Sequence, residues 1–518
     1  MTSLPAPLSG LTDPAAYPHP VDSVRVIETH VSWVLLAGEF AYKVKRPVRY
    51  AFVDLRDPER RRFYCEEELR LNRRFAPQLY LSVCPIREES SHLRVGAGGG
   101  RVLEHAVRMR RFRIEDGLDR LLSARRIEPL ELEAFGRALA GLHQQLPVAA
   151  DSSPWGRPER VRAGIERNLA ECIEAMHGTS LEGDALALRE PFVQCLDAAA
   201  EALAARRAAG KIRECHGDLH SGNVVRLGST LVPFDCMEFE PAFRWIDVAE
   251  EVGFLAVDLL ARQRPLHAHA FRSGYLAAGG DFEACRVLRL YEAHRAAVRA
   301  KVAAISARNA AASASDSHWQ RLAARLLRCA TEALQIRRPR LILLCGLAGA
   351  GKTWLARALA PRLDAVHIRS DVERKRRTGL DERARSGSAV GAGLYTAAMS
   401  AAVYEQLAQA SRAVIAGGFT VLVDASFGRR SDRARFGALA RELGAGVTLV
   451  HVRAPLAVLR ARVTARLRGG HDASEAGEAV LEQQLRDFEP PQSDEGLPLL
   501  ELDSTDPEVL DHLVEGLG

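Results

Sequence analysis

Two separate groups of residues in this sequence have the types and the spacing that transfer of a phosphate group requires. In the run HGDLHSGN, from His216 to Asn223, an aspartate stands five positions before an asparagine. We interpret Asp218 as the general base for an acceptor hydroxyl and Asn223 as a ligand for Mg²⁺. In the run GLAGAGKT, from Gly346 to Thr353, a lysine and a hydroxyl residue follow glycines. That pattern predicts a loop that binds the phosphates of ATP.

A predicted β-hairpin adds a second metal ligand to the first group. Gly228 and Ser229 separate two short apolar stretches, and Asp235 ends the second of them. A hairpin centred on Ser229 places Asn223 opposite Asp235, and directly opposed residues are about 5 Å apart. The two side chains would then share one Mg²⁺. The alternative, in which the loop residues only cap one another, is disfavoured by three correctly spaced residues around the hairpin.

A phosphate-transfer site of this kind also needs a lysine on a strand and an acid that holds it. The run AYKVK puts Lys43 and Lys45 on one face of a predicted strand. We choose Lys43 for the phosphates and keep Lys45 as the alternate. Of the three glutamates at 66–68, in the next predicted helix, we choose Glu68 as the partner. A solvated acidic face is the other interpretation of this run.

The first half of the chain resembles the aminoglycoside phosphotransferase family of kinase-like enzymes. The segments that carry the resemblance are CHGDLHSGN, with the spacing of the protein-kinase catalytic loop, PFDCMEF, WIDVAEEVGFL and ALAGLH. The resemblance implies an α+β protein-kinase-like fold in which Asp218 is the base and Asn223 and Asp235 bind the metal. It also implies that Asp247 caps a helix and braces the loop. We interpret His143 as a helix-end residue, and no GxGxxG run precedes the lysine strand.

The glycine-rich run of the second half has the sequence context that a phosphate-binding loop requires. It follows an apolar, strand-like run at 341–345 and precedes a helical pattern at 354–363. Lys352 would then bridge the β and γ phosphates, and Thr353 would bind Mg²⁺. The glycines whose backbone N–H groups would face phosphate oxygens are Gly346, Gly349 and Gly351.

Two acidic residues complete the predicted second site. Asp424 ends an apolar, strand-like run and would hold Mg²⁺ through water. The residue after it is Ala425 and not the glutamate that motor ATPases use, which favours a kinase. Asp371 is the candidate general base of this half. A helix cap is the alternative interpretation of each aspartate.

Two pairs of arginines have the spacing of a shared helical face. Arg462 and Arg466 precede Gly469-Gly470, so a lid could move there and place Arg466 over the transferred phosphate. Arg295 and Arg299 of the first half would reach an anionic acceptor in the same way. A solvated basic helix is the alternative interpretation of both pairs.

The second half resembles the predicted kinases related to gluconate kinase, polynucleotide 5′-kinase and zeta-type toxin kinases. The matching segments are GLAGAGKT, RSDVERKR, VLVDASF and RVTARLRGGHDASEA. The resemblance implies an α/β P-loop kinase domain with a parallel sheet, and a small-molecule or nucleotide-end hydroxyl as acceptor. Together the two halves are similar to proteins described as bifunctional aminoglycoside phosphotransferase/ATP-binding proteins, a description that reflects fold.

Length and composition are those of a chain with more than one globular domain. The 518 residues are 47% hydrophobic and 26% charged, with a net charge of +5. This charge balance favours neither nucleic acid nor a membrane surface as partner, and no apolar run reaches the length of a membrane span. Nine cysteines without CxxC spacing, and an N-terminus without a secretory signal, predict reduced thiols and a cytoplasmic location.

The order of elements predicts two domains after a short leading segment. The first domain is expected to begin with antiparallel strands that turn at Gly38 and Glu39, and to continue mainly as helices. Residues 310–317, rich in Ala and Ser, predict a linker or a helix junction. The three segments are an irregular N-terminus at 1–23, a kinase-like domain at 24–336 and a P-loop domain at 340–518.

Both halves thus predict an ATP-dependent phosphotransferase that uses Mg²⁺ and the hydroxyl group of a small molecule as acceptor. One alternative is a nucleotide-binding regulatory protein, which the base and metal residues of both halves disfavour. The other is a nucleic-acid 5′-end kinase in the second half, which its few aromatic residues disfavour. Acceptor specificity is expected within 161–210 and 384–418, where the sequence carries no recognisable code, and no oligomeric state is indicated.

Overall fold

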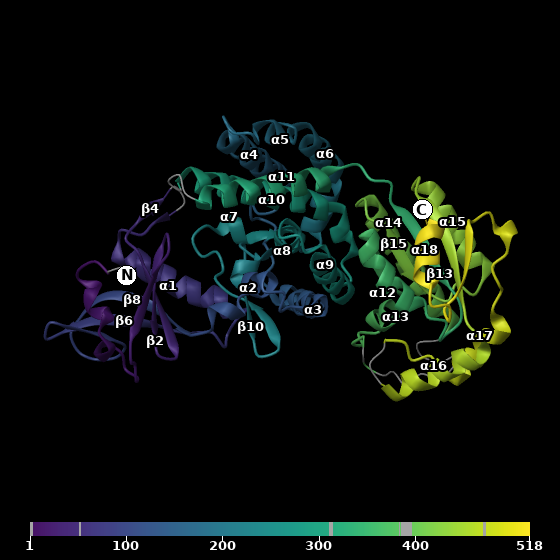
Figure 1. The fold of residues 1–518 in the computed structure, drawn as a ribbon, viewed down its shortest axis with the longest axis horizontal. Coiled ribbons are helices and arrows are strands. Elements are labelled where there is room, and N and C mark those ends of the chain that lie inside the picture. Colours follow the sequence, from purple (N-terminus) through teal and green to yellow (C-terminus); the bar gives the residue numbers. More distant parts are fainter. Residues whose placement is uncertain are drawn as a thin grey trace.

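The computed structural model describes residues 4–50, 53–309, 314–382, 384, 396–469 and 473–517. Figure 1 shows an antiparallel sheet at the N-terminal end, helices in the middle and a parallel sheet at the other end. Helices end at Asn309 and begin again at Ala314, so the predicted junction falls on 310–313, outside the described residues. None of the helices within the described residues is long and apolar enough to cross a membrane.

A six-stranded antiparallel sheet forms the N-terminal end of the fold, and its strands are hydrogen-bonded in the order β1-β2-β3-β8-β6-β7. The predicted turn at Gly38 and Glu39 is confirmed, because β2 and β3 pair on either side of it. Gly38 has a φ of +56° there, which glycine adopts without strain. The elements are β1 (Val24–Glu28), β2 (Ser32–Ala37), β3 (Phe40–Lys45), β4 (Arg49–Tyr50), β5 (Val53–Asp54), α1 (Pro58–Asn72), β6 (Tyr80–Glu89), β7 (His92–Val95) and β8 (Arg101–Arg110).

The leading segment contains two 3₁₀ helices where an irregular chain was predicted. They span Leu8–Thr12 and Pro14–Ala16. Leu8 and Leu11 are buried in a cluster with residues of the six-stranded sheet. Residues three apart share a face of a 3₁₀ helix, so the two leucines enter this core together. The prediction missed them because so short an element leaves no readable periodicity.

The middle of the fold is mainly helical, as predicted, but residues 245–247, predicted to begin a helical region, are a strand. These residues form the strand β12, because pairing with β9 satisfies their backbone hydrogen-bonding groups. The elements are α2 (Leu118–Ser123), α3 (Pro129–Gln145), α4 (Pro158–Met176), α5 (Glu182–Leu186), α6 (Arg189–Ala208), β9 (Ile212–Glu214), β10 (Val224–Leu227), β11 (Thr230–Pro233), α7 (Pro241–Arg244), β12 (Trp245–Asp247), α8 (Val248–Ala261), α9 (Pro265–Gly279), α10 (Cys285–Asn309) and α11 (Ala314–Leu334).

Helix α8 lies at the centre of this helical part and is buried on nearly all sides. An apolar helix of this kind occupies the core, yet α8 also carries the buried acids Glu250, Glu251 and Asp258. Buried carboxylates require partners. Helices α3 and α9 pack closely beside it: a Cβ added at Gly136 would lie 2.2 Å from the Phe271 carbonyl oxygen, so only glycine fits.

The predicted hairpin is present, but its register is shifted. β10 and β11 are joined by a two-residue turn, so the hairpin is centred between residues 228 and 229 and not on residue 229. The Phe234 amide, not that of Asp235, donates to the Asn223 carbonyl oxygen, at 2.9 Å. The predicted pairing of Asn223 with Asp235 is therefore wrong. Asp235 follows with a φ of +66°, a left-handed conformation that changes the chain direction at this point.

The C-terminal end of the fold is an α/β domain with a parallel sheet, as predicted. Its five strands are in the order β14-β15-β13-β16-β17. The glycine-rich loop follows the carboxyl end of the central strand β13, the edge at which open parallel sheets bind ligands. The elements are β13 (Arg340–Cys345), α12 (Lys352–Leu363), β14 (Val366–Arg369), α13 (Ser370–Arg377), α14 (Ala397–Ala416), β15 (Val421–Asp424), α15 (Arg430–Glu442), β16 (Gly446–Arg453), α16 (Leu456–Gly469), α17 (Glu478–Asp487), β17 (Leu499–Asp503) and α18 (Val509–Leu517).

Helices α9 and α10 of the middle part contact the parallel-sheet domain through buried polar groups. Arg272 is 6% exposed and bonds to Glu292 on its own side and to Asp364 across the contact. The Arg289 guanidinium lies over the Phe419 ring, 3.9 Å from its centroid. These contacts fix the position of α12 and α13, which follow the glycine-rich loop, relative to α9 (Figure 1).

Candidate active sites

The glycine-rich loop between β13 and α12 encloses Lys352. The Lys352 ammonium donates to the carbonyl oxygens of Gly346, at 2.8 Å, and Leu347, at 2.9 Å. Burial lowers the pKa of Lys352, although the charge of Asp424 acts in the opposite sense. Phosphate oxygens would give this ammonium charged partners in place of neutral carbonyls. The motif glycines, all with positive φ, are Gly346 (+143°), Gly349 (+81°) and Gly351 (+98°).

Thr353 and Asp424 lie together beside this loop. The Thr353 hydroxyl donates to a carboxylate oxygen of Asp424 at 2.6 Å, and the His367 Nε2 lies 3.3 Å from the same oxygen. Burial acts to raise the pKa of Asp424, but His367 and Lys352 hold it well below its usual range. An ionised carboxylate and a hydroxyl oxygen are suited to Mg²⁺. Sequence reasoning missed His367, because a histidine within a strand carries no distinguishing spacing.

A cavity of about 830 Å³ opens beside the loop, and Asp371 lines it together with Arg374, Ser400 and Tyr404. Asp371 lies in the first turn of α13, whose N-cap is Arg369. The alternative interpretation of Asp371 as the helix cap is therefore wrong, and so is that of Asp424, which ends a strand. The charge of Asp371 also acts on Lys352. A carboxylate, a lysine and space for an acceptor thus occur together.

Two arginines from α16 reach the same cavity. Arg462 donates to the Gly349 carbonyl oxygen at 3.3 Å and to the Ser504 hydroxyl at 2.7 Å. Arg466, the residue chosen from the sequence, donates to the Ala476 carbonyl oxygen at 2.8 Å. Arg462 is thus the arginine that touches the glycine-rich loop. Gly470, part of the predicted lid hinge, lies outside the described residues.

In the first domain, Lys43 joins Glu68 to Asp235. The Lys43 ammonium donates to Glu68 at 2.8 Å and to Asp235 at 2.5 Å. Burial acts to lower the pKa of Lys43, but these two carboxylates raise it well above its ordinary value. The Asp235 side chain is 42% exposed, so it faces the space where a metal and phosphates would bind. The structure thus brings together the three residues chosen from the sequence.

Lys45 occupies a different environment from Lys43, although both lie on β3. Its side chain is fully buried, and its ammonium donates to Glu68 at 2.5 Å and also to Glu238. The ring of Phe239 lies under it, with the centroid 5.0 Å away. A lysine enclosed on all sides cannot reach the phosphates of a nucleotide. Of the two lysines that the sequence left open, Lys43 is the one with access.

Asp218 and Asn223 are in direct contact in the loop between β9 and β10. The Asn223 amide donates to an Asp218 carboxylate oxygen at 3.0 Å, so its amide oxygen is the atom suited to a metal. The His220 ring lies 3.6 Å from the Asp218 carboxylate. Burial acts to raise the pKa of Asp218, but His220 holds it below its ordinary value. Asp218 is therefore ionised at neutral pH and can accept a proton.

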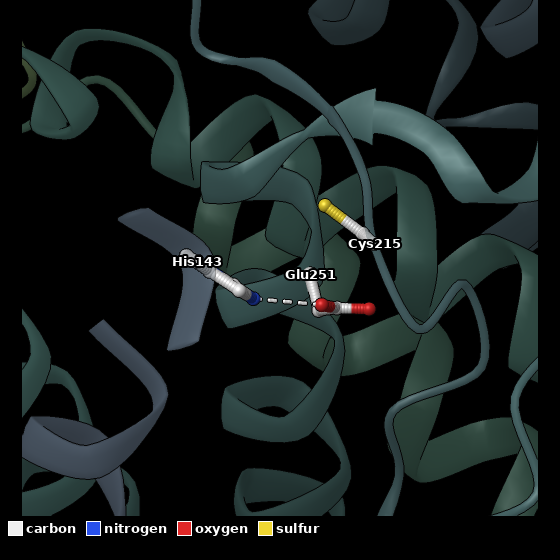
Figure 2. Close-up of side chains that lie close together, drawn as sticks. All are labelled: His143, Cys215 and Glu251. Carbon is white, nitrogen blue, oxygen red and sulfur yellow. Dashed lines mark hydrogen bonds and ion pairs between the residues drawn. The ribbon is translucent and has the colours of Figure 1, made fainter. Parts of the chain in front are cut away.

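A buried chain of hydrogen bonds holds this loop in place, and Figure 2 shows the part of it between His143 and Glu251. The His143 ring contacts the Tyr275 hydroxyl at 2.9 Å and Glu251 at 2.8 Å. Glu251 in turn accepts from the Gly217 amide, next to Asp218, at 2.8 Å. Burial acts to raise the pKa of Glu251, but these hydrogen bonds hold it below its ordinary value.

Cys215 lies close to the same two side chains, and the donor atoms of His143, Cys215 and Glu251 lie within 4.8 Å of one another. Both ring nitrogens of His143 already contact other groups, and burial raises the pKa of the Cys215 thiol well above its usual value. A protonated thiol is a poor metal ligand. The group therefore positions the loop instead of holding a metal.

The residues that brace the loop differ from the prediction. Asp247 caps α8 as expected, but its carboxylate is held by Arg206, and the loop amides are held by Glu251 and Asp258. His143 lies in the last turn of α3, yet its contact with Glu251 was not foreseen. The signal that could have revealed both is the occurrence of acids on an otherwise apolar helix.

The two arginines of α10 that the sequence suggested for an anionic acceptor are both paired with acids, and Arg295 also lines the cavity next to Asp218. The Arg295 Nε lies 3.0 Å from Glu250, and Arg299 lies 3.3 Å from Asp258. The prediction could not see these partners because both acids come from α8. A second cavity, next to Asp218, is lined partly by these helices and partly by α4.

Comparison with known proteins matches two separate parts of the chain. Residues 41–288 match the family described as "Phosphotransferase enzyme family", and residues 341–491 match one described as "AAA domain". A gluconokinase from Sinorhizobium meliloti 1021 is 23% identical and covers 35% of this chain and 93% of its own, with a TM-score of 0.24. A choline/ethanolamine kinase family protein from Mesorhizobium loti is 13% identical and covers 62% and 89%, with a TM-score of 0.36.

The fold and the matched families define the class: a kinase-like phosphotransferase-family domain followed by a P-loop kinase domain. Among curated proteins, uncharacterized protein Rv2004c of Mycobacterium tuberculosis is 30% identical over 475 residues, which are 91% of this chain and 92% of that protein. The uncharacterized protein Mb2027c of Mycobacterium bovis matches to the same extent. The chain belongs to the same two-domain family as these mycobacterial proteins.

Proposed function

We propose that this chain is an ATP-dependent phosphotransferase with two active sites, each of which transfers the γ-phosphate of MgATP to a hydroxyl group of a small molecule. The observation that carries the proposal is the arrangement in the first domain. An ionised Asp218 contacts Asn223, and Lys43 contacts Asp235. Asp218 also lines a cavity large enough for an acceptor.

In the first site, Lys43 would bind phosphate oxygens and Glu68 would hold it in place. Asn223 and Asp235 would hold Mg²⁺, which when bound neutralises charge on the transferred phosphate. Asp218 would accept the proton of the acceptor hydroxyl, whose oxygen then attacks phosphorus. Glu251 keeps the Gly217 amide, and therefore the loop, in position during this step.

In the second site, Lys352 and the loop amides would bind the phosphates, and Thr353 and Asp424 would hold Mg²⁺. Asp371 would accept the acceptor proton from its place in the cavity. Arg466 would stabilise the charge that develops on the transferred phosphate. We keep the boundaries 24–336 and 340–518 for the two catalytic units as part of this proposal.

Transfer of labelled γ-phosphate from ATP into the small-molecule fraction of a bacterial extract tests the proposal. Asp218→Asn is expected to abolish one set of labelled products and Asp371→Asn another, since each removes a base without altering the fold. Asp184→Asn, an exposed change on α5, is the matched control and should retain all products. Unchanged labelling in the double variant Asp218→Asn/Asp371→Asn would show that neither carboxylate takes part in catalysis.

A further inference from the structure

The residues that line the cavity beside Asp218 restrict the class of acceptor that it can bind. Its volume is about 570 Å³, within the range of small-molecule sites. Asp218 and Gly217 lie at one side, α4 and α10 form the walls, and residues 242–245 close the edge. Helices α4 and α10 run in the same direction, since Glu171 contacts Lys301 and Glu174 contacts Arg308 further along both.

Two residues that line this cavity have buried side-chain polar atoms without hydrogen-bond partners in the part of the chain that the structure describes. Asn168 on α4 is only 7% exposed, yet neither its amide nitrogen nor its amide oxygen has a hydrogen-bond partner among the described residues. The Nδ1 atom of His294 on α10 is also buried and unpartnered in that part of the chain. Buried amides are normally satisfied, because an unmade hydrogen bond is costly. A ligand bound in the cavity would be able to supply the missing partners.

The protonation state of His294 fixes what its free atom can do. Burial, with Arg295 and Lys301 nearby, lowers the pKa of His294 to about 3, so the ring is neutral at physiological pH. Its Nε2 lies 3.6 Å from the Glu250 carboxylate, which favours the tautomer with the proton on Nε2. Nδ1 is then a hydrogen-bond acceptor.

The cavity carries no excess of charge. Its lining has four acidic and four basic side chains, and five of these eight are paired within the protein. Of the other three, Arg160 and Arg167 are exposed, so solvent screens their charge, and Asp218 is the proposed base. A polycationic amino sugar would require an excess of acid, and a phosphorylated or carboxylated acceptor an excess of base. The acids are Glu171, Asp218, Asp247 and Glu250, and the bases are Arg160, Arg167, Arg295 and Lys301. The pairs are Glu171 with Lys301 (2.7 Å), Glu250 with Arg295 (3.0 Å) and Asp247 with Arg206 (2.7 Å).

Aromatic rings complete the lining and give it flat apolar surfaces. Trp155 and Trp245 are half-buried at the cavity, and Phe243 and Phe254 line it as well. Such rings pack against the C–H faces of a ring-shaped molecule whose edges carry hydroxyls. The cavity therefore joins apolar faces to a few isolated hydrogen-bonding atoms.

We propose that the acceptor of the first domain is a neutral, polyhydroxylated ring, of the sugar or cyclitol class, held by Asn168 and His294. Hydroxyls both donate and accept, so they can satisfy the Asn168 oxygen, the Asn168 nitrogen and the His294 acceptor atom at once. This inference rests on the proposed function, because it assigns an acceptor to that site. One hydroxyl gives its proton to Asp218, its oxygen bonds to the γ-phosphorus, and the bond from phosphorus to the β–γ bridging oxygen breaks to release ADP.

ADP release by the full chain carrying Lys352→Ala, which silences the second site, tests this with three sets of probes. These are neutral polyols (ribose, glucose, trehalose and myo-inositol), an aminoglycoside, and sugar acids. We expect stimulation by at least one neutral polyol and by neither other set. Asn168→Leu, of similar volume, should raise KM for that polyol at least about tenfold and leave KM for ATP unchanged.

Asn168→Leu also separates binding from a structural role. The melting temperature of the variant should equal or exceed that of the wild type, since it removes an unsatisfied buried amide. Glu166→Gln, on the exposed face of the same helix, is the control and should change neither KM. Three outcomes would overturn the inference. The first is stimulation of ADP release by only charged probes or by none. The others are an unchanged KM for the polyol in Asn168→Leu and a clear loss of stability in that variant. Loss of ATP binding at the first site would instead overturn the proposed function.

Discussion

The two proposed nucleotide sites of this chain would hold the same kind of ligand with different parts of the polypeptide. The P-loop site uses backbone groups: three glycines with positive φ curl the chain, and Lys352 rests on its carbonyls. The site of the first domain uses side chains, in which Lys43, Glu68 and Asp235 form a partly buried charged cluster. A backbone cradle depends on conformation, whereas a side-chain cluster depends on charge balance.

The two sites also differ in how far apart their residues lie in the sequence. The glycine-rich loop lies within eight consecutive residues, 346–353, so its function can be recognised from sequence directly. The cluster of the first domain joins Lys43 to Asp235, which are 192 positions apart. The two sites therefore fail in different ways when mutated, and each prediction below uses that contrast.

The largest effect is expected from removing a charge inside the side-chain cluster. Lys45→Met leaves Glu68 and Glu238 buried without their shared cation, and such a loss costs about 3–5 kcal/mol of unfolding free energy. Lys43→Met is expected to weaken ATP binding at the first site more than it lowers stability, because its side chain is partly accessible. Denaturant unfolding and calorimetry measure the two effects.

Lys301→Met is the control for this pair of variants, since its contact with Glu171 is partly exposed and worth less than about 1 kcal/mol. Equal stability losses in Lys43→Met and Lys45→Met would contradict the division of roles between the two lysines.

A single added methyl group should disrupt the glycine-rich loop at 346–353. A Cβ added at Gly346 would lie 2.3 Å from the Val452 carbonyl oxygen, so Gly346→Ala should weaken ATP binding at the second site by about 100-fold, or ~3 kcal/mol. Gly444→Ala is the matched control: its φ is also positive, at +61°, but an added Cβ there meets nothing within 4 Å. Titration calorimetry on both variants measures the difference, and similar affinities would contradict the close approach.

The stability of the first domain should also depend on pH, through the titration of His294. Its pKa is lowered to about 3 in the fold, by burial and by Arg295 and Lys301, while Glu250 faces its ring. The unfolded chain takes up this proton near pH 6.5 and the folded chain does not, so stability falls as the pH is lowered. Between pH 7 and pH 5 the loss from this residue is about 2 kcal/mol.

Denaturant unfolding of wild type and His294→Gln at both pH values isolates this contribution, because the other histidines are common to both proteins. The variant should lose about 2 kcal/mol less than the wild type over the same range. An equal loss in the two proteins would mean that His294 is protonated in the fold.

The smallest predicted effect concerns Glu251, whose hydrogen bonds hold the catalytic loop between β9 and β10 in position. Glu251→Gln keeps the shape of the side chain but removes the charge that holds His143 and the Gly217 amide. We expect kcat of the first domain to fall about tenfold, or ~1.4 kcal/mol, with KM for ATP unchanged. Glu283→Gln, an exposed change, serves as control. A change in KM alone would contradict a positioning role.

The parts of the sites that sequence could predict are those whose partners are local or whose spacing is distinctive. The P-loop residues, the Asp218–Asn223 pair and the choice of Glu68 all fall in this group. The hairpin was placed correctly but one-half residue out of register, because Gly228 and Ser229 both belong to the turn. Such a shift cannot be read from composition.

The remaining features depend on which helix faces are adjacent in space, which a single sequence does not encode. Glu251 meets His143 from another helix, Arg295 meets Glu250, and Asn168 reaches the cavity beside Asp218. Each is polar on a helix face that packing has buried. Such positions become informative only when the packing partner is known.

The central claim, that the chain has two nucleotide sites of different construction, is tested most directly by calorimetric titration with MgATP. Wild type, Lys352→Ala and Asp235→Ala are compared under the same conditions. The account predicts two binding events in the wild type, with one lost in each variant and the other unchanged. A single event in the wild type that disappears only in Lys352→Ala would contradict it and leave the first domain without a nucleotide site.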